Sequence, residues 1–255
     1  MIYIGILDTS KINPSDGCVI SKIPEEARGR VEKTKIEREK AARAGAYLML
    51  PLLCSRAFGA ENIKICYTGK GKPYIIARDN VNNRSQTTYN ISLSHDGDIA
   101  AVLITDGQLD VGIDVQSLKE NVNTDAVSKR FFERCEALMG DVSEQKSLLG
   151  YPRLMGENVL LTCFDCVDGC ITEAPCGEFL YEGGSVSEKE SCFLGKWTYL
   201  ESALKMSGEG FAALNFFDKI IDGSECRRLD FFKRGKYYSL TAILKRKNEP
   251  NGNRT

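Results

Sequence analysis

The 255-residue chain carries 34 Lys and Arg against 35 Asp and Glu, a net charge of −1, and 42% of its residues are hydrophobic. This length and composition predict a sizeable core in one large or two small domains, and the balanced charge excludes a global basic field for nucleic acid. No apolar run reaches the ~18 residues that a membrane span needs, and MIYIGILDTS resembles a first strand rather than a signal peptide. We therefore expect a cytoplasmic protein that binds neither membrane nor nucleic acid, with its ten cysteines mostly reduced.

The first half of the chain predicts a strand, a long helix and a series of strands. Residues 2–7 are β-rich, and the charge-dense residues 25–50 predict a helix that Pro51 kinks or ends. ENIKICYTG predicts a strand, and GKGKPYI a turn leading into another. NISLSHDGDIAAVLITD predicts two strands joined by a tight turn at Asp96–Gly97, and VGIDVQSL predicts one strand more.

The second half predicts a comparable arrangement with an insert. TDAVSKRFFERCEALMG predicts an amphipathic helix, residues 141–195 are interpreted as irregular and cysteine-rich, and residues 197–207 predict a helix followed by strands. NISLSHDGDIAAVLI and LDFFKRGKYYSLTAIL both have a strand, glycine turn, strand pattern after a long helix, which indicates two related α+β halves. We expect an N-terminal subdomain at 1–116 and a C-terminal subdomain at 117–255 that contains the insert at about 141–195.

Two carboxylates stand out as candidate site residues. Glu201 and Lys205 in KWTYLESALKMSGEG are four residues apart on one helix face, as a surface ion pair or as the edge of an active site. In GIDVQ, Asp114 and Gln116 share one face of a strand and offer half of a Mg²⁺ site. The alternative is that Asp114 caps a turn or pairs with a lysine.

The single histidine is a third candidate. His95 is predicted in a tight turn beside Ser94, where it is exposed enough to titrate or to contact an anion. The alternative is a structural histidine whose hydrogen bonds are satisfied.

Four stretches in order resemble the 4′-phosphopantetheinyl transferases. GIDVQ and W-x-x-x-E-S-x-x-K-x-x-G-x-G at 197–210 are similar to the two signatures of that family, and GKP at 71–73 and SLSHDG at 92–97 to its auxiliary motifs. KRFFERCEAL resembles a helix of the same family. The resemblance covers most of the chain except residues 141–195 and the last ten. Length and layout resemble the larger, monomeric, surfactin-type branch, which implies a pseudo-dimer of two similar α+β subdomains, each a mainly antiparallel sheet packed with a long helix.

The resemblance also implies a reaction and a set of site residues. Phosphopantetheine would move from coenzyme A to a serine of an acidic acyl or peptidyl carrier protein, leaving 3′,5′-ADP, with Mg²⁺ on the pyrophosphate. The metal ligands would be Asp114 and Glu201, with Gln116 as a neutral oxygen donor, and Glu201, Lys205 and Asp114 would be catalytic. The residues implied at coenzyme A are Ser94, His95, Lys72, Pro73, Arg28, Arg43 and Lys205, with Arg30 or Lys33 as alternatives to Arg28 at the 3′-phosphate.

The sequence departs from the family pattern at three positions. Leu200 stands where the family usually has lysine, and Gln116 where it often has glutamate. Pro51 interrupts a helix that the family runs straight. Fewer charges weaken Mg²⁺ binding, so the alternative function is a catalytically weak or inactive relative that binds coenzyme A or a carrier protein without turnover.

The insert carries four closely spaced cysteines. TCFDCVDGCITEAPC contains Cys163, Cys166, Cys170 and Cys176. A Cys-x-x-Cys pair can begin a zinc site, but the usual second pair and a nearby histidine are missing, so we expect reduced, non-ligating thiols. The alternatives are structural zinc, an iron–sulfur cluster, or an unrelated metal-binding or redox protein. By the family resemblance, the insert lies where the carrier protein binds and shapes partner choice.

Overall fold

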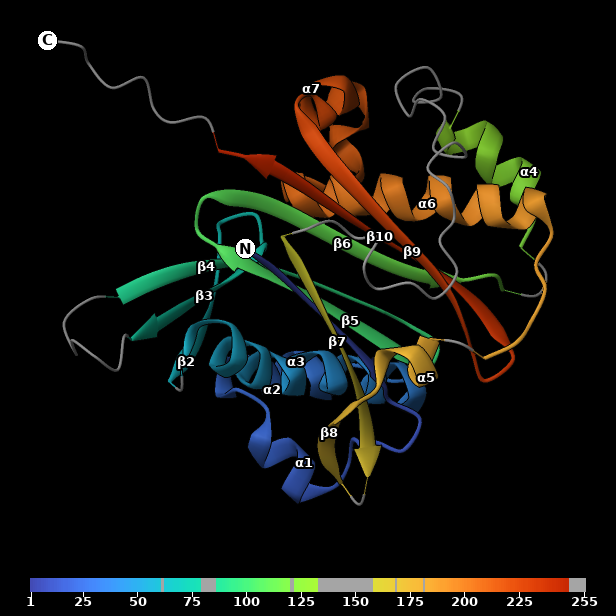
Figure 1. Ribbon diagram of the computed structural model, residues 1–255. Coiled ribbons are helices and arrows are strands. Elements are labelled where there is room, and N and C mark those ends of the chain that lie inside the picture. The colour runs from blue at the N-terminus through green and yellow to red at the C-terminus, as the bar shows by residue number, and fades with distance from the viewer. Residues whose placement is uncertain are drawn as a thin grey trace, which may run out of the picture.

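The computed structural model describes residues 1–60, 62–78, 86–119, 122–132, 158–167, 169–180 and 182–247. These residues form two sheets and the helices that cover them, which confirms the predicted α+β class. The layers run helix α3, seven-stranded sheet, three-stranded sheet, helix α6 (Figure 1). None of the helices in this part of the chain is long and apolar enough to cross a membrane.

The larger sheet has the strand order β2-β3-β4-β5-β1-β7-β8. Its neighbours pair antiparallel except β1 and β7, which pair parallel. The strands are β1 (Ile2–Asp8), β2 (Ile63–Tyr67), β3 (Pro73–Arg78), β4 (Gln86–Asp96), β5 (Ile99–Asp106), β7 (Val159–Val167) and β8 (Cys170–Ala174).

The smaller sheet is antiparallel, with β10 (Lys236–Arg246) between β6 (Leu109–Ser117) and β9 (Ser224–Lys233). Strand β6 lies almost entirely in the predicted N-terminal subdomain at 1–116, yet it pairs with the C-terminal strand β10. In the opposite direction, β7 and β8 from the segment 117–255 complete the larger sheet beside β1. The two sheets are thus interlocked by exchanged strands.

The predicted helix at 25–50 differs from the structure in two ways. It is divided into α2 (Glu25–Glu32) and α3 (Glu37–Phe58), preceded by a short α1 (Gly17–Lys22). Pro51 does not end α3, which runs past it to Gly59 in the left-handed region at φ 64°. Buried residues follow the proline at Leu53 and Cys54, so packing against the sheet outweighs the hydrogen bond that proline removes.

The interpretation of residues 141–195 as irregular is wrong for most of the residues that the structure describes, although residues 182–187 have no regular secondary structure. This stretch contains β7, β8, α5 (Cys176–Leu180) and the start of α6 (Glu188–Ser207), which begins well before the predicted residue 197. Ser187 and Glu190 form a capping box at its N-terminus, a sequence signal that marks the true start. Residues 133–157, including the C-terminal part of the predicted helix at 124–140, lie outside the described residues.

The remaining helical segments flank α6. They are α4 (Thr124–Val127), a π-helical turn at Ser128–Phe132, a 3₁₀ segment at Gly210–Phe216 and α7 (Phe217–Ile221).

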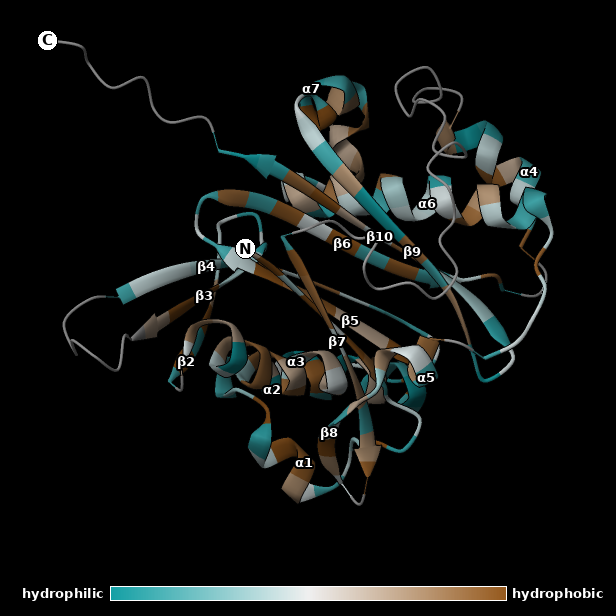
Figure 2. Cartoon of the chain, viewed as in Figure 1, coloured by the Kyte–Doolittle hydropathy of each residue, from teal (hydrophilic) through white to brown (hydrophobic). Residues whose placement is uncertain are grey.

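The core has three layers of apolar side chains that match the layers of the fold. Met49 and Leu53 pack α3 on the larger sheet, Ile4 and Leu240 meet between the sheets, and Leu204 packs α6 on the smaller sheet. Figure 2 shows hydrophobic positions along the strands between the two long helices. Burial of this surface fixes α6 over β6, where the candidate site lies.

Candidate active site

Helix α6 approaches β6 so closely that only glycine fits at position 112. A Cβ on Gly112 would lie 1.9 Å from the Ser202 carbonyl oxygen and 2.7 Å from the Met206 nitrogen. Ser202 Oγ donates to the Thr241 carbonyl oxygen at 2.7 Å, which fixes the helix along the sheet. Asp114, two residues after Gly112 on the same strand face, is therefore held under α6.

Polar side chains of β4 bind the free edge of β6. Alternate residues of SLSHD face β6 and accept hydrogen bonds from its backbone N–H groups, which satisfies donors that have no strand partner on that side. The bonds are Ile113 N to Ser92 Oγ at 3.0 Å, Val115 N to Ser94 Oγ at 3.2 Å and Ser117 N to Asp96 Oδ2 at 2.8 Å. The roles of Ser92 and Asp96 were not predicted, although Ser92, Ser94 and Asp96 recur at every second residue of this strand.

Asp114, Ser94 and Lys205 form one hydrogen-bonded group. Lys205 Nζ lies 2.6 Å from Asp114 Oδ1 and 2.9 Å from Ser94 Oγ, which donates to Asp114 Oδ1 at 2.7 Å. Asp114 is 1% exposed, and its Oδ2 has no hydrogen-bond partner among the described residues. A buried carboxylate oxygen without a partner is energetically costly, and its donor chemistry fits a hard divalent cation such as Mg²⁺.

Glu201 lies one turn before Lys205 on α6 and contributes the second carboxylate. Burial raises the pKa of Glu201, the charge of Asp114 raises it further, and Lys205 lowers it. The predicted face that carries Glu201 and Lys205 is therefore partly buried, and Asp114 rather than Glu201 accepts the lysine's hydrogen bond. A carboxylate with a raised pKa accepts a proton more readily near neutral pH.

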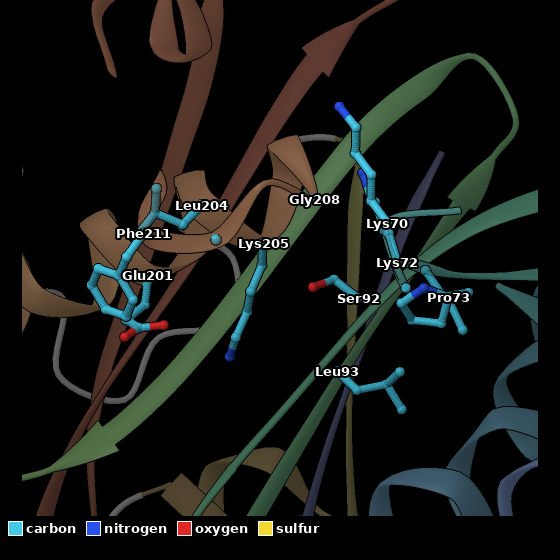
Figure 3. Close-up of a pocket in the computed structure, with 13 residues that line it drawn as sticks. Lys70, Lys72, Pro73, Ser92, Leu93, Glu201, Leu204, Lys205, Gly208 and Phe211 are labelled. Atoms are coloured by element: carbon cyan, nitrogen blue, oxygen red, sulfur yellow. The ribbon is translucent and has the colours of Figure 1, made fainter. Parts of the chain in front are cut away.

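A hollow of about 270 Å³ opens beside this group. Figure 3 shows Lys70, Lys72 and Pro73 on one side of it and Glu201, Leu204 and Lys205 on the other. Lys72 Nζ donates to the Met206 carbonyl oxygen at 2.6 Å and lies 3.7 Å from Asp110. Burial lowers the pKa of Lys72. Three lysines thus face a hollow with an apolar wall, which suits an anionic ligand with an apolar part.

The expectation that His95 lies in a tight turn is wrong. His95 lies within β4, and the turn falls at Gly97 and Asp98. It follows Ser94, so its side chain takes the opposite face of the sheet, where Arg43 Nε lies 3.5 Å from its Nε2. Burial, with the charges of Arg43 and Lys205, lowers the pKa of His95 to about 4, so it is neutral at pH 7.

Four other predicted residues lie elsewhere. Arg28 donates to the carbonyl oxygens of Ser21 and Ile23 at the end of α1, and does not line the hollow. The Arg30 guanidinium stacks 3.9 Å above the Tyr67 ring, while Lys33 caps the end of α2. Gln116 lines a second hollow of about 350 Å³, which shares Glu201 with the first.

The structure does not assemble a structural zinc site in the part of the chain that it describes. No three or more His, Cys, Asp or Glu residues are grouped there in a way that would hold a metal ion. Cys163 and Cys166 of the Cys-x-x-Cys pair are buried, Cys170 is exposed and Cys176 is partly exposed. Asp114 and Glu201 supply two carboxylates, which is the number that Mg²⁺ commonly takes when phosphate and water complete its shell.

No family model matches the chain, and no curated protein matches it. The assignment of a function therefore rests on the residues and their arrangement. Paired carboxylates from two elements, an adjacent lysine and a lysine-lined hollow suit metal-assisted transfer of a phosphorylated group.

Proposed function

We propose that the protein is a Mg²⁺-dependent 4′-phosphopantetheinyl transferase of the surfactin type. It would move phosphopantetheine from coenzyme A to a serine of an acyl or peptidyl carrier protein in the cytoplasm. The observation that carries this proposal is the unpartnered Oδ2 of buried Asp114, beside Glu201 and Lys205 at the contact between β6 and α6. These three residues are those that the family resemblance assigns to metal binding and catalysis.

A pseudo-dimeric architecture is part of the proposal. Its support is the mirrored order of layers, with α3 on the outer face of one sheet and α6 on the outer face of the other. The hairpin β4–β5 in one sheet corresponds to the hairpin β9–β10 in the other, and each has glycine in its turn. We draw the boundary between the halves before Leu109 rather than at 116, because β6 pairs with β10. The protein would act as a monomer.

The carboxylates would hold Mg²⁺ against the pyrophosphate of coenzyme A. Asp114 Oδ2 and Glu201 would be the direct ligands, and Gln116, which lines a hollow together with Glu201, would contribute through water. The ion, when bound, would offset negative charge on the phosphoryl oxygens. Lys205 would contact the same phosphates as a point charge. Ser94 hydrogen-bonds to both Lys205 and Asp114 and so holds the two side chains in position.

The hollow would take the nucleotide end of coenzyme A. Lys72 and Pro73 line it, with Lys70 beside them, and they place cationic and apolar surface on the wall facing α6. Arg43, which touches His95 and the Arg30 carbonyl oxygen, would reach a phosphate from the other face of β4. Neutral His95 would serve this ligand as a hydrogen-bonding group rather than as a cation.

Glu201 would also receive the proton of the carrier serine, directly or through one water. Its pKa is raised by burial and by Asp114, which brings its basicity closer to neutral pH. An acidic carrier protein would be drawn to a local basic patch, since the chain as a whole carries a net charge of −1.

The test is mass spectrometry of apo carrier proteins incubated with the full chain, coenzyme A and Mg²⁺. We expect a mass gain of one phosphopantetheine, lost with EDTA and in Glu201→Ala. Glu225→Ala changes an exposed glutamate on β9 and should leave the gain intact. The absence of a gain with every carrier tested, while coenzyme A still binds, would overturn the transferase.

A binding-only relative is the second candidate. Leu200 is fully buried between α6 and the smaller sheet, so the position that is usually lysine in the family contributes no charge to the site. Gln116 likewise replaces a carboxylate with a neutral amide. Calorimetry that shows coenzyme A binding with little dependence on Mg²⁺, and without transfer, would favour this candidate.

A further inference from the structure

Two cysteines of the cysteine-rich segment, Cys163 and Cys176, lie near each other at the end of the β7–β8 ladder. Cys163 lies opposite Ala174 in the β7–β8 ladder, and Cys176 follows Ala174 by two residues, where the chain turns into α5. This turn brings the Cys176 side chain beside that of Cys163. Cys176 Sγ also lies 3.7 Å from the Leu161 carbonyl oxygen, which fixes its position beside β7.

The two thiols differ in access to solvent. Cys163 is 0% exposed within the core between the two sheets, whereas Cys176 is partly exposed. A reagent in solution therefore reaches Cys176 first, and Cys163 is placed to react only with a group already formed on Cys176.

The environment also makes Cys176 the stronger nucleophile at neutral pH. The neighbouring Cys163 side chain lowers the pKa of Cys176 to about 7, and the charge of Arg56 contributes. The neighbouring Cys176 side chain, together with burial, raises the pKa of Cys163. Burial likewise raises the pKa of Cys54 and Cys166, which are structural thiols.

We propose that Cys176 and Cys163 form a redox-active dithiol, which a hydroperoxide converts to an intramolecular disulfide. The Cys176 thiolate attacks one peroxide oxygen, the O–O bond breaks, and the leaving oxygen takes a proton to become water or an alcohol. The product is a sulfenic acid on Cys176. The Cys163 sulfur then attacks the Cys176 sulfur, the S–O bond breaks, and hydroxide leaves with the Cys163 proton as water. The two sulfurs together give up the two electrons that reduce the hydroperoxide.

The disulfide would join β7 to α5 away from the proposed catalytic residues. Phe179 and Leu180 of α5 are buried between the two sheets, and Figure 1 places α5 at the opposite end of the sheets from the α6 C-terminus. The inference is independent of the transferase proposal, since Asp114, Glu201 and Lys205 take no part in it.

The experiment treats the reduced full chain with increasing hydrogen peroxide at pH 7 and blocks remaining thiols with N-ethylmaleimide. A protease that cleaves after Asp and Glu then separates the four cysteines, because Asp165, Asp168 and Glu173 lie between them. We expect a Cys163–Cys176 linked peptide that lacks two hydrogens and disappears on reduction. It should form at lower peroxide than oxidation of exposed Cys18 and Cys170.

The pH dependence gives a second readout. Alkylation of Cys176 should have a midpoint near pH 7, and an ordinary thiol one near pH 8.5. At pH 7 the larger thiolate fraction, offset by the lower intrinsic nucleophilicity, predicts about a 3-fold faster reaction at equal access.

Two variants complete the test. Cys176→Ser should abolish the linked peptide and leave carrier modification unchanged. Cys163→Ser should leave a sulfenic acid on Cys176 that a cyclic 1,3-dione traps. If this buried substitution prevents folding, the presence of the linked peptide in wild type and its absence in Cys176→Ser still test the proposal. The proposal is overturned if Cys18 or Cys170 oxidises first, or if Cys176 links to a cysteine other than Cys163.

Discussion

Gly112→Ala tests whether the packing of α6 on β6 sets the geometry of the site. The new Cβ would lie 1.9 Å from the Ser202 carbonyl oxygen, and an ordinary contact is 3.4–4 Å. Both obstructing atoms belong to the backbone, so relief requires α6 to move by about 1.5 Å. Such overpacking costs about 1–3 kcal/mol of unfolding free energy. Lys205 moves with α6, and its 2.6 Å bond to Asp114 would be stretched beyond hydrogen-bonding distance.

The assay is urea denaturation together with the initial rate of carrier modification. We expect a lower denaturation midpoint with an unchanged slope, and a rate reduced by about 100-fold, since a displacement of about 1 Å has that effect on a positioned site. Gly29→Ala is the matched control: nothing lies within 4 Å of its added Cβ, and helix α2 should gain about 0.5–1 kcal/mol. Our reasoning fails if Gly112→Ala unfolds within about 0.5 kcal/mol of wild type, the scatter of a neutral surface change.

Three further predictions concern charge. Lys205→Met should lower the free energy of unfolding by about 2 kcal/mol, because it leaves the buried Asp114 carboxylate without its cationic partner. Lys70→Met, at an exposed ion pair, should change the free energy of unfolding by under about 0.5 kcal/mol. Equal effects of the two substitutions in denaturation would contradict this. Glu201→Gln should be more stable than wild type at pH 7 and equally stable at pH 4 in denaturation. The folded chain raises the pKa of Glu201, so the contribution of this residue to stability falls as pH rises from the pKa of the unfolded chain through that of the folded chain. The free energy of unfolding of wild type should fall by up to about 3 kcal/mol as pH falls from about 6.5 to about 4. In this range His95 binds a proton in the unfolded chain but stays neutral in the folded chain, where its pKa is about 4. An unaltered pH profile of stability in His95→Gln would argue against this.

The sequence predicted the elements whose pattern is local. The hairpin β4–β5 and strand β6 follow from their β-rich sequence pattern and a glycine turn. The proximity of Asp114 to α6 was implied by the family resemblance. What failed depends on contacts between distant segments. Pro51 looked like a helix end because the sequence does not show which face of α3 is buried. The parallel pairing of β7 with β1 joins segments more than 150 residues apart, and no local pattern specifies it.

The site residues divide in the same way. Glu201 and Lys205 were placed on one helix face by their spacing, the family resemblance implied Ser94 and Asp114 beside them, and the four residues lie together in the structure. Arg28 was chosen by position and sign of charge alone, and its donors are taken by the carbonyl oxygens of α1. The place of His95 was misjudged because a one-residue shift of the turn puts it inside β4, facing Arg43.

The hydrogen bonds from β6 to the side chains of β4 have a consequence for amide exchange. The N–H groups of Ile113, Val115 and Ser117 lie on the edge of a three-stranded sheet, where exchange with deuterium is ordinarily fast. Here each is held by a side chain of the other sheet, so each opens only when the two sheets separate. Their exchange rates therefore report the free energy of parting the two sheets, and should match those of β10 if the chain unfolds as one cooperative unit.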